Sequence, residues 1–366
     1  MQFEQKTKPK KKKEIKKRKM NQGNNSNNRN ESKEIDEEEE RIMYQLGKIK
    51  NNKCKTVEFD GQLEKQRQDK VLILIYSDKC EAFIFDEKTE ELTEIEGVSL
   101  PTLHHCLVTI PNGNILLFYG VNTKTGYASS NIELFDSKNQ TFSTIANTIE
   151  ERIDASCVLL SSAIVFICGG RTRKWGYNSC EFFDPRTCVS SRSKARMKED
   201  RISHTASLLP DGRVIICGGV SINKATIHRA ALKTTEIYDP SSDSFSDGPL
   251  MTVGRVDHAE TTLSDGRVFI CGGVTQYDVM ATEIYNYKTN SFNAGPRTLY
   301  ERYGCFSVLL SNGKVLISDF KPAREDSDNG YGNSEIFDPQ TNTISSFSKI
   351  IFTGPYCSPF ASASCF

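Results

Sequence analysis

The chain has 366 residues, 37% of them hydrophobic, and its 47 basic residues are balanced by 47 acidic ones. This length allows one large domain or two ordinary ones, with a substantial core. The zero net charge gives no reason to expect a nucleic-acid or membrane partner, and no segment approaches the ~20 apolar residues that a membrane-spanning helix needs.

Residues 1–50 are predicted to be a disordered tail. They contain a lysine-rich block, then an Asn-rich tract, then an acidic run, and such segments bury too little apolar surface to offset the entropy lost on folding. No apolar stretch follows the lysine block, so it is not a secretory signal. It is either a nuclear import signal or part of a solvated tail. Residues 51–70 are predicted to be a polar linker.

The first strand-like runs are residues 71–76, which are continuously apolar, and residues 81–86, which read E-A-F-I-F-D. Both have the length and composition of β-strands. They match the second and third strands of a unit that recurs further along the chain. No counterpart of that unit's first strand precedes them.

The recurring unit is clearest at residues 201–247. Its four predicted strands are residues 204–209, 213–217, 235–238 and 244–245. Tight turns at Asp211-Gly212 and Asp239-Pro240 join the first strand to the second and the third to the fourth. Four strands of this length need neighbours, because a short sheet is not stable alone.

Complete units begin at five equivalent positions, 50, 49, 54 and 47 residues apart: Thr102, Arg152, Arg201, Arg255 and Arg302. Self-similarity at such a period is the signature of stacked repeats, and the length differences fall mostly in the loop between second and third strands. The last residues, 358–366, fit the first strand that the first unit lacks, with Ala363-Ser364 where Ala206-Ser207 lie in the fourth. The C-terminal strand is therefore predicted to close a ring of six.

The pattern R-x-x-H…D-G-R-V-x-I-C-G-G…E-I-Y-D-P…F resembles the kelch family of β-propellers, and especially the subgroup related to the propeller domain of galactose oxidase. The match covers about residues 71–366. Three repeats replace the Gly pair, and Phe or an aliphatic residue stands where the family usually has Trp. The resemblance implies an all-β, six-bladed propeller. Its predicted blades are residues 71–97 with 355–366, 102–145, 152–193, 201–247, 255–294 and 302–348.

In such a ring the loops between second and third strands share one face with the crossovers between blades. The resemblance implies that this face engages a partner peptide. Its candidate binding residues are Arg171, Arg173, Trp175 and Tyr177 in the third unit, and Lys224, His228 and Arg229 in the fourth. Arginine beside the chain's single Trp is typical of an interface anchor. We hypothesise a basic, aromatic-lined pocket over blades three and four that binds an acidic peptide or another anion. The alternative is a solvated loop with Trp175 packed against the neighbouring blade.

Four arginines occupy one register, where each first strand begins: Arg152, Arg201, Arg255 and Arg302. They either line the mouth of the channel and bind a carboxylate, or bind the carbonyls and acids of the crossovers between repeats. A second register holds three histidines: His105, His204 and His258. Repeat symmetry explains their coincidence, so no metal site is predicted.

Cysteines also follow the repeat. Cys168, Cys217 and Cys271 each precede a Gly pair, which indicates packing on strands in a reducing compartment. A disulfide between Cys180 and Cys188, across a hairpin, is the alternative for those two residues. The localisation predicted from these observations is intracellular, in the cytoplasm, the nucleus or both.

Two enzymatic interpretations need separate residues. The galactose oxidase resemblance implies a copper site with two Tyr and two His ligands, and the five histidines do not supply that set. A sugar epimerase needs an acid–base pair in the channel, and Asp154 and Asp257 are more simply loop-end residues. We therefore predict a monomeric, non-enzymatic module without cofactor that binds a partner protein or peptide. The alternative is a sugar-binding or sugar-processing propeller of the epimerase or oxidase kind.

Overall fold

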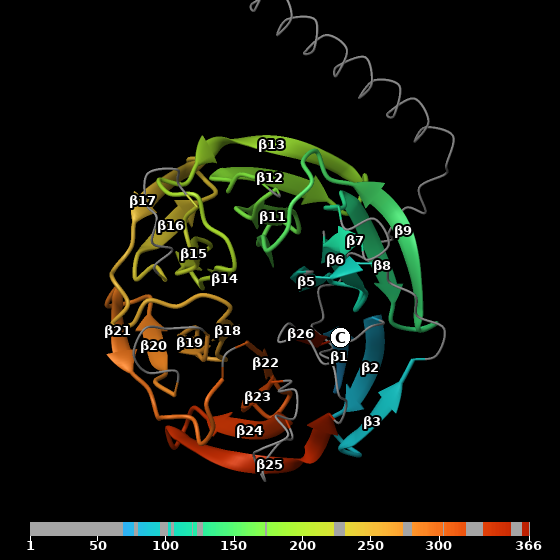
Figure 1. Ribbon diagram of the computed structural model, residues 1–366, viewed down its shortest axis with the longest axis vertical. Coiled ribbons are helices and arrows are strands. Elements are labelled where there is room, and N and C mark those ends of the chain that lie inside the picture. Colours follow the sequence, from blue (N-terminus) through green and yellow to red (C-terminus); the bar gives the residue numbers. More distant parts are fainter. Residues whose placement is uncertain are drawn as a thin grey trace, which may run out of the picture. The chain divides into compact units, whose positions relative to one another are not determined.

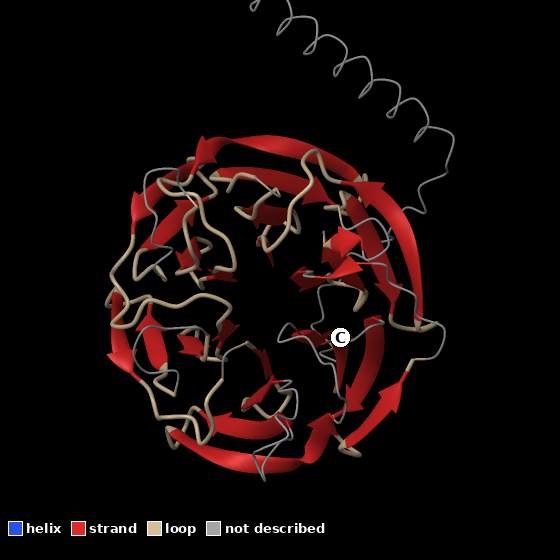
Figure 2. Cartoon of the chain, viewed as in Figure 1, coloured by secondary structure: helices blue, strands red, loops and turns tan. Residues whose placement is uncertain are grey.

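The computed structural model describes residues 69–76, 80–95, 102–103, 106–118, 120–122, 127–172, 174–222, 231–273, 280–302, 304–319, 332–352 and 361–365. The predicted tail at residues 1–50 and all but the end of the predicted linker lie outside the described residues. Within these ranges the only regular elements are strands (Figure 2), and no helix there is long and apolar enough to span a membrane.

The strands form six antiparallel four-stranded sheets, arranged as the blades of a propeller (Figure 1). Blade 2 contains β5 (Cys106–Thr109), β6 (Ile115–Phe118), β8 (Asn131–Asp136) and β9 (Thr141–Asn147), and a small ladder beside it pairs β4 (Thr102–Leu103) with β7 (Val121–Asn122). Blade 3 contains β10 (Ser156–Leu159), β11 (Val165–Cys168), β12 (Ser179–Asp184) and β13 (Val189–Arg196).

The next three blades repeat this order along the chain. Blade 4 contains β14 (Thr205–Leu208), β15 (Val214–Cys217), β16 (Thr235–Asp239) and β17 (Ser244–Asp247). Blade 5 contains β18 (Ala259–Thr262), β19 (Val268–Cys271), β20 (Glu283–Asn286) and β21 (Ser291–Ala294). Blade 6 contains β22 (Cys305–Leu309), β23 (Val315–Asp319), β24 (Gly332–Asp338) and β25 (Thr343–Phe352). The first strand of each blade contacts the first strands of its two neighbours, which closes the ring.

Blade 1 combines β26 (Ala361–Cys365) with β1 (Lys70–Tyr76), β2 (Cys80–Asp86) and β3 (Glu91–Glu94). Ala363 of β26 lies opposite Ile73, as Ala206 lies opposite Ile216 in blade 4. The prediction that the C-terminal strand closes the ring is therefore confirmed, and its register matches to the residue.

The second strand of a blade supplies most of the core. All four residues are buried in β6, β11, β15 and β19. Continuous apolar runs are expected where a sheet is buried on both faces. Here the neighbouring blades pack on the two faces of each sheet. Phe166 of blade 3 stacks on Tyr238 of blade 4 with ring centroids 4.2 Å apart.

The Gly pair after the second strand joins adjacent blades. The backbone N–H of Gly219 donates to the carbonyl of Arg255 in the next blade, 2.8 Å away. Gly218 has a φ of 63°, and a Cβ there would lie 2.6 Å from the same carbonyl oxygen. A side chain would therefore be strained and would push the blades apart.

The cysteines divide into two groups. Cys168, Cys217, Cys271 and Cys180 are free and buried, so Cys180 does not pair with Cys188. A disulfide not predicted from the sequence joins Cys106 of β5 to Cys157 of β10, with Cα atoms 6.0 Å apart. It links the first strands of blades 2 and 3. The intracellular localisation stays a prediction.

Candidate functional site

The face that carries the second-to-third-strand loops and the crossovers also carries most of the exposed apolar surface. Seven large hydrophobic side chains are exposed among the described residues, and Val189 is the one in an outer strand. The other six lie in those loops and crossovers: Tyr127, Ile149, Trp175, Leu250, Leu299 and Tyr300. We call these six residues the apolar face.

The blade-3 loop holds Trp175 in a fixed, outward position. The backbone N–H of Thr172 donates to the Trp175 carbonyl at 2.9 Å, and that of Tyr177 donates to the Gly170 carbonyl at 2.7 Å. The Thr172 hydroxyl oxygen accepts from the backbone N–H of Trp175 at 3.1 Å. Trp175 is nevertheless 50% exposed, so it is not buried against the neighbouring blade.

The other predicted binding residues of this loop contact side chains of the same protein. Arg171 Nε lies 3.1 Å from Asp154 Oδ2, and the Tyr177 ring lies 4.7 Å from the guanidinium of the buried Arg152. The remaining predicted binding residues lie outside the described residues: Arg173, Lys224, His228 and Arg229. The predicted pocket over blades three and four therefore stays a prediction.

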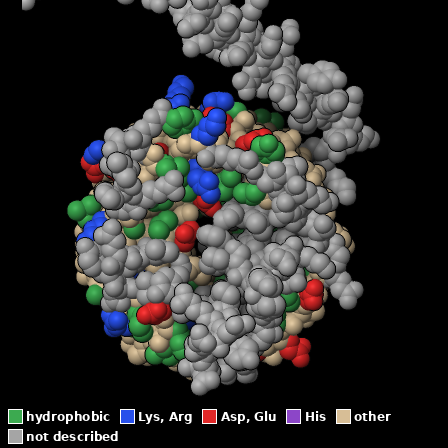
Figure 3. All heavy atoms as spheres, in the orientation of Figure 1, with side chains coloured by type: hydrophobic (Ala, Val, Ile, Leu, Met, Phe, Trp, Pro, Cys, Tyr) green, Lys and Arg blue, Asp and Glu red, His purple; other side chains and the backbone are tan. Residues whose placement is uncertain are grey.

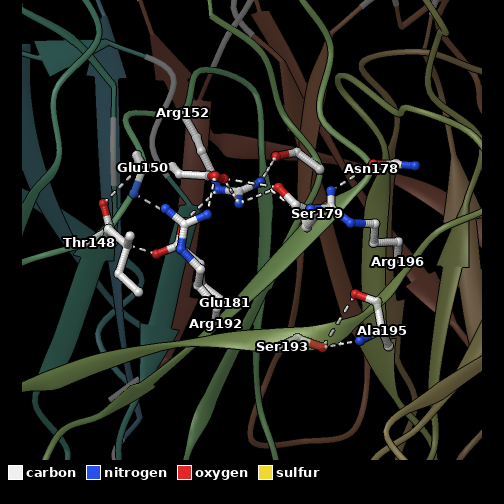
Figure 4. Close-up of polar contacts among 12 residues, drawn as sticks. Thr148, Glu150, Arg152, Asn178, Ser179, Glu181, Arg192, Ser193, Ala195 and Arg196 are labelled. Carbon is white, nitrogen blue, oxygen red and sulfur yellow. Dashed lines mark hydrogen bonds and ion pairs between the residues drawn. The ribbon is translucent and has the colours of Figure 1, made fainter. Parts of the chain in front are cut away.

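The four repeat arginines are buried, and each binds a glutamate on the third strand of its own blade (Figure 4 shows the Arg152 cluster). The Nε–carboxylate distances are 3.1 Å for Arg152–Glu181, 3.0 Å for Arg201–Glu236, 3.4 Å for Arg255–Glu283 and 2.7 Å for Arg302–Glu335. Arg152, Arg201 and Arg255 also donate to the carbonyl of the first glycine of the Gly pair. Because 1% or less of each residue is exposed, they do not offer a ligand site to solvent. Crossover acids contact two of them, Glu150 with Arg152 and Glu199 with Arg201. The partners common to the set, however, are the third-strand glutamates of the same blade, which the interpretation of crossover contacts did not include.

The same glutamates hold the crossovers. Each accepts a hydrogen bond from the backbone N–H three residues before its arginine: Ile149, Lys198, Thr252 and Leu299. Burial raises the pKa of Glu181, and Arg152 beside it acts in the opposite direction. With its N–H turned inward, the residue at this position faces outward, and all four side chains are exposed. The arginine–glutamate clamp thus presents Ile149 and Leu299 on the apolar face.

Charged side chains are also exposed on blade 3. Figure 3 shows Lys and Arg side chains gathered over blade 3, at the top of the view. Arg192 pairs with Glu150 at 3.1 Å and Lys198 with Asp247 at 3.0 Å. Neighbouring acids therefore compensate much of this basic charge, and the exposed aromatic groups distinguish the face more clearly than its charge does.

The two described histidines are buried and contact the preceding blade. His204 Nε2 lies 3.4 Å from Cys168 Sγ of blade 3, and His258 Nε2 lies 2.8 Å from Thr205 Oγ1 of blade 4. Burial lowers the pKa of each to about 3, so both are neutral at physiological pH. Within the described ranges no three His, Cys, Asp or Glu residues converge as metal ligands do, and His105 lies outside them.

Because these two histidines are buried, we predict that acid lowers the folding stability of the protein. Their pKa values are about 3 in the folded protein and about 6.5 in an unfolded chain, so protons bind the unfolded state first. Stability should be complete above pH 6.5 and fall as the pH drops toward 3, by roughly 1 kcal/mol per histidine at pH 5.5. Urea titrations at pH 7.5 and 5.5 measure the loss. The double variant His204→Gln/His258→Gln should lose less between the two pH values, and an unchanged loss would contradict the assignment.

Comparisons with known proteins support the fold over two thirds of the chain and match its sequence over a quarter. No family model matches the chain. Two curated proteins named galactose oxidase, both from Gibberella zeae, are 39% identical over 92 residues. That stretch is 25% of this chain and 12% of each relative. The solved structure titled "Structure of YjhT" superposes with a TM-score of 0.53 at 14% identity, over 66% of this chain and 82% of that one.

Proposed function

Because the chain is a kelch-type, six-bladed β-propeller, we propose that it is a protein-interaction module whose partner binds the apolar face. The observation that carries this proposal is the gathering of six of the seven described exposed hydrophobic side chains on that one face. Scattered exposed apolar residues are normal, whereas a set on one face of a rigid scaffold is typical of a binding surface.

Trp175 is the proposed anchor. Its loop is held by backbone hydrogen bonds, so binding costs little additional ordering of the chain. Tryptophan and arginine dominate the energetics of protein interfaces, and Arg171 stands four residues away in the same loop. The partner we propose is a protein or peptide that places an apolar side chain against Trp175 and acidic groups against the surrounding cations.

The test is affinity capture from the source cells with the full chain and its Trp175→Ala variant. Removing a central Trp from an interface typically costs ~2 kcal/mol or more, so recovery of the specific partner should fall about thirtyfold. Trp175→Phe should retain most of the binding. Arg213→Ala, which changes a partly exposed residue directly after a turn on the opposite face, should bind like the wild type. Equal recovery by Trp175→Ala and the wild type would remove the proposal.

Sugar binding or processing is a second candidate, and one cluster favours it. The hydroxyl of Thr205 on β14 lies 2.5 Å from Glu260 Oε2 and 2.8 Å from His258 Nε2, both of blade 5. Burial raises the pKa of Glu260, and a perturbed carboxyl beside an imidazole is a candidate acid–base pair. The similarity to galactose oxidase over 92 residues points in the same direction. Thermal stabilisation by galactose, without any protein partner lost in Trp175→Ala, would favour this candidate.

A further inference from the structure

The outer strand of blade 3 differs from every other outer strand. β13 (Val189–Arg196) reads V-S-S-R-S-K-A-R and carries three cations: Arg192, Lys194 and Arg196. The outer strands β3, β9, β17 and β21 contain no Lys or Arg, and β25 contains one. Among the described strands β13 pairs on one side only, with β12.

The three cations occupy alternate positions, and the residues between them, Ser193 and Ala195, contact blade 4. The strand is irregular here, since Arg192 lies opposite Glu181 and Arg196 opposite Ser179. Arg192 Nη1 contacts Glu150 at 3.1 Å and Arg196 Nη1 contacts Asn178 at 3.3 Å (Figure 4). The Lys194 ammonium has no ion-pair partner within the described ranges. An extended chain with acidic residues at every second position presents them all on one side, as β13 presents its cations.

The opposite side of β13 borders a shallow pocket between blades 3 and 4. Its volume is about 450 Å³, and its apolar lining includes Leu160, Phe182, Val189 and Pro240. Val189 is 58% exposed. The alternation of β13 therefore separates a basic side from an apolar one, and an added strand would place its own alternate side chains on the same two sides.

Cations on an edge strand commonly prevent edge-to-edge association, but four of the other five outer strands lack them. The backbone edge of β13 is also occupied at one end. Asp243 of blade 4 accepts from the Lys194 backbone N–H at 3.1 Å and from the Ser193 hydroxyl at 2.7 Å. Among the described residues, no strand pairs with the edge at residues 189–192, beside the pocket.

We propose that the edge of β13 binds an extended segment of a partner protein in which acidic residues alternate with apolar ones. Its backbone pairs with residues 189–192, its acidic side chains face Arg192 and Lys194, and an apolar side chain enters the pocket at Val189. This surface lies on the outer rim of blade 3, and Trp175 takes no part in it.

The probe is a synthetic decapeptide in which four glutamates alternate with four valines between terminal glycines, measured by fluorescence anisotropy at low salt. A second peptide of equal composition has its glutamates and valines in separate blocks. The full-length wild type should bind the alternating peptide more tightly than the block peptide. Lys194→Glu/Arg196→Glu should weaken binding about tenfold, and Val189→Asp should weaken it as well.

The matched control is Lys138→Glu/Lys288→Glu, which reverses the charge of two exposed lysines in turns of other blades. It changes the net charge by the same amount as Lys194→Glu/Arg196→Glu. This control and Trp175→Ala should bind the alternating peptide like the wild type. Equal loss in the control pair would reduce the effect to net charge and overturn the proposal. So would equal affinity of the wild type for the two peptides, or no binding of either. Because Trp175→Ala tests the apolar face alone, the two proposals can fail separately.

Discussion

Replacing Glu236 with alanine is expected to lower the free energy of unfolding by about 3 kcal/mol, because it removes the buried counter-ion of a buried guanidinium. The remaining acid, Glu199, lies 3.5 Å from Arg201 and its side chain is 39% exposed. Arg201 and Glu236 are 1% and 2% exposed, and their Nε–Oε1 distance is 3.0 Å. The substitution also removes the acceptor of the Lys198 backbone N–H. The crossover into blade 4 therefore loses its attachment in the same step.

Urea denaturation followed by circular dichroism measures this loss. Asp211→Ala is the control, since it removes the partner of Arg213 in an ion pair whose side chains are 39% and 35% exposed. Exposed pairs contribute little, so this change should stay below ~1 kcal/mol. The double variant Arg201→Met/Glu236→Leu should be more stable than Glu236→Ala, because buried ion pairs can often be replaced by apolar residues. A Glu236→Ala variant no less stable than Asp211→Ala would refute the clamp.

Deleting residues 361–366 is expected to abolish the folded ring. The deletion removes five residue pairings between β26 and β1. It also uncovers Val71, Leu72 and Ile73, which are fully buried. Each lost hydrogen bond costs ~1 kcal/mol, and the exposed apolar surface adds to that cost. The total loss is comparable to the free energy of unfolding of a typical domain, about 5–15 kcal/mol. The variant should be largely unfolded or aggregated by circular dichroism and size-exclusion chromatography.

A variant with the strand relocated distinguishes the effect of opening the ring from the effect of losing residues. Residues 361–365 are placed before Lys70, joined by a copy of the turn at residues 209–213, so that blade 1 acquires the connectivity of the other five. This chain should recover the cooperative unfolding of the wild type. A truncated chain that unfolds like the wild type would show that β26 is not needed to close the ring.

The fold was predictable because its signals are local and repeated. Asp211-Gly212 and Asp239-Pro240 mark turns, and the spacing of Arg152, Arg201, Arg255 and Arg302 fixes the period. The register of Ala363 followed from alignment with Ala206. The disulfide between Cys106 and Cys157 was not predictable in this way. In the register of the repeat, Cys106 is equivalent to Ser156 and Cys157 is equivalent to Ala206. The two cysteines therefore occupy different positions in their strands. They meet only because neighbouring first strands are staggered, and the sequence of a single repeat does not show that stagger.

The site was predictable only in part. The register of the arginines was evident, but Glu236 was hidden in the strand pattern T-E-I-Y-D, and its long-range role depends on a crossover from the preceding blade. The exposure of Trp175 depends on how its loop is bonded to Thr172 and Gly170. The cations of β13 were visible as residues, whereas their position on an outer edge required the order of strands in the sheet.

Ring closure by β26 has a consequence for synthesis. A ribosome delivers β1–β3 first and β26 last, 271 residues after Glu94. At ~5–20 residues per second, blade 1 waits about 14–54 s for its missing strand. During that time the apolar edge of β1 can pair with other nascent chains, so blade 1 is the part of this protein with the greatest need of a chaperone. Blades 2–6 have all four of their own strands as soon as they leave the exit tunnel.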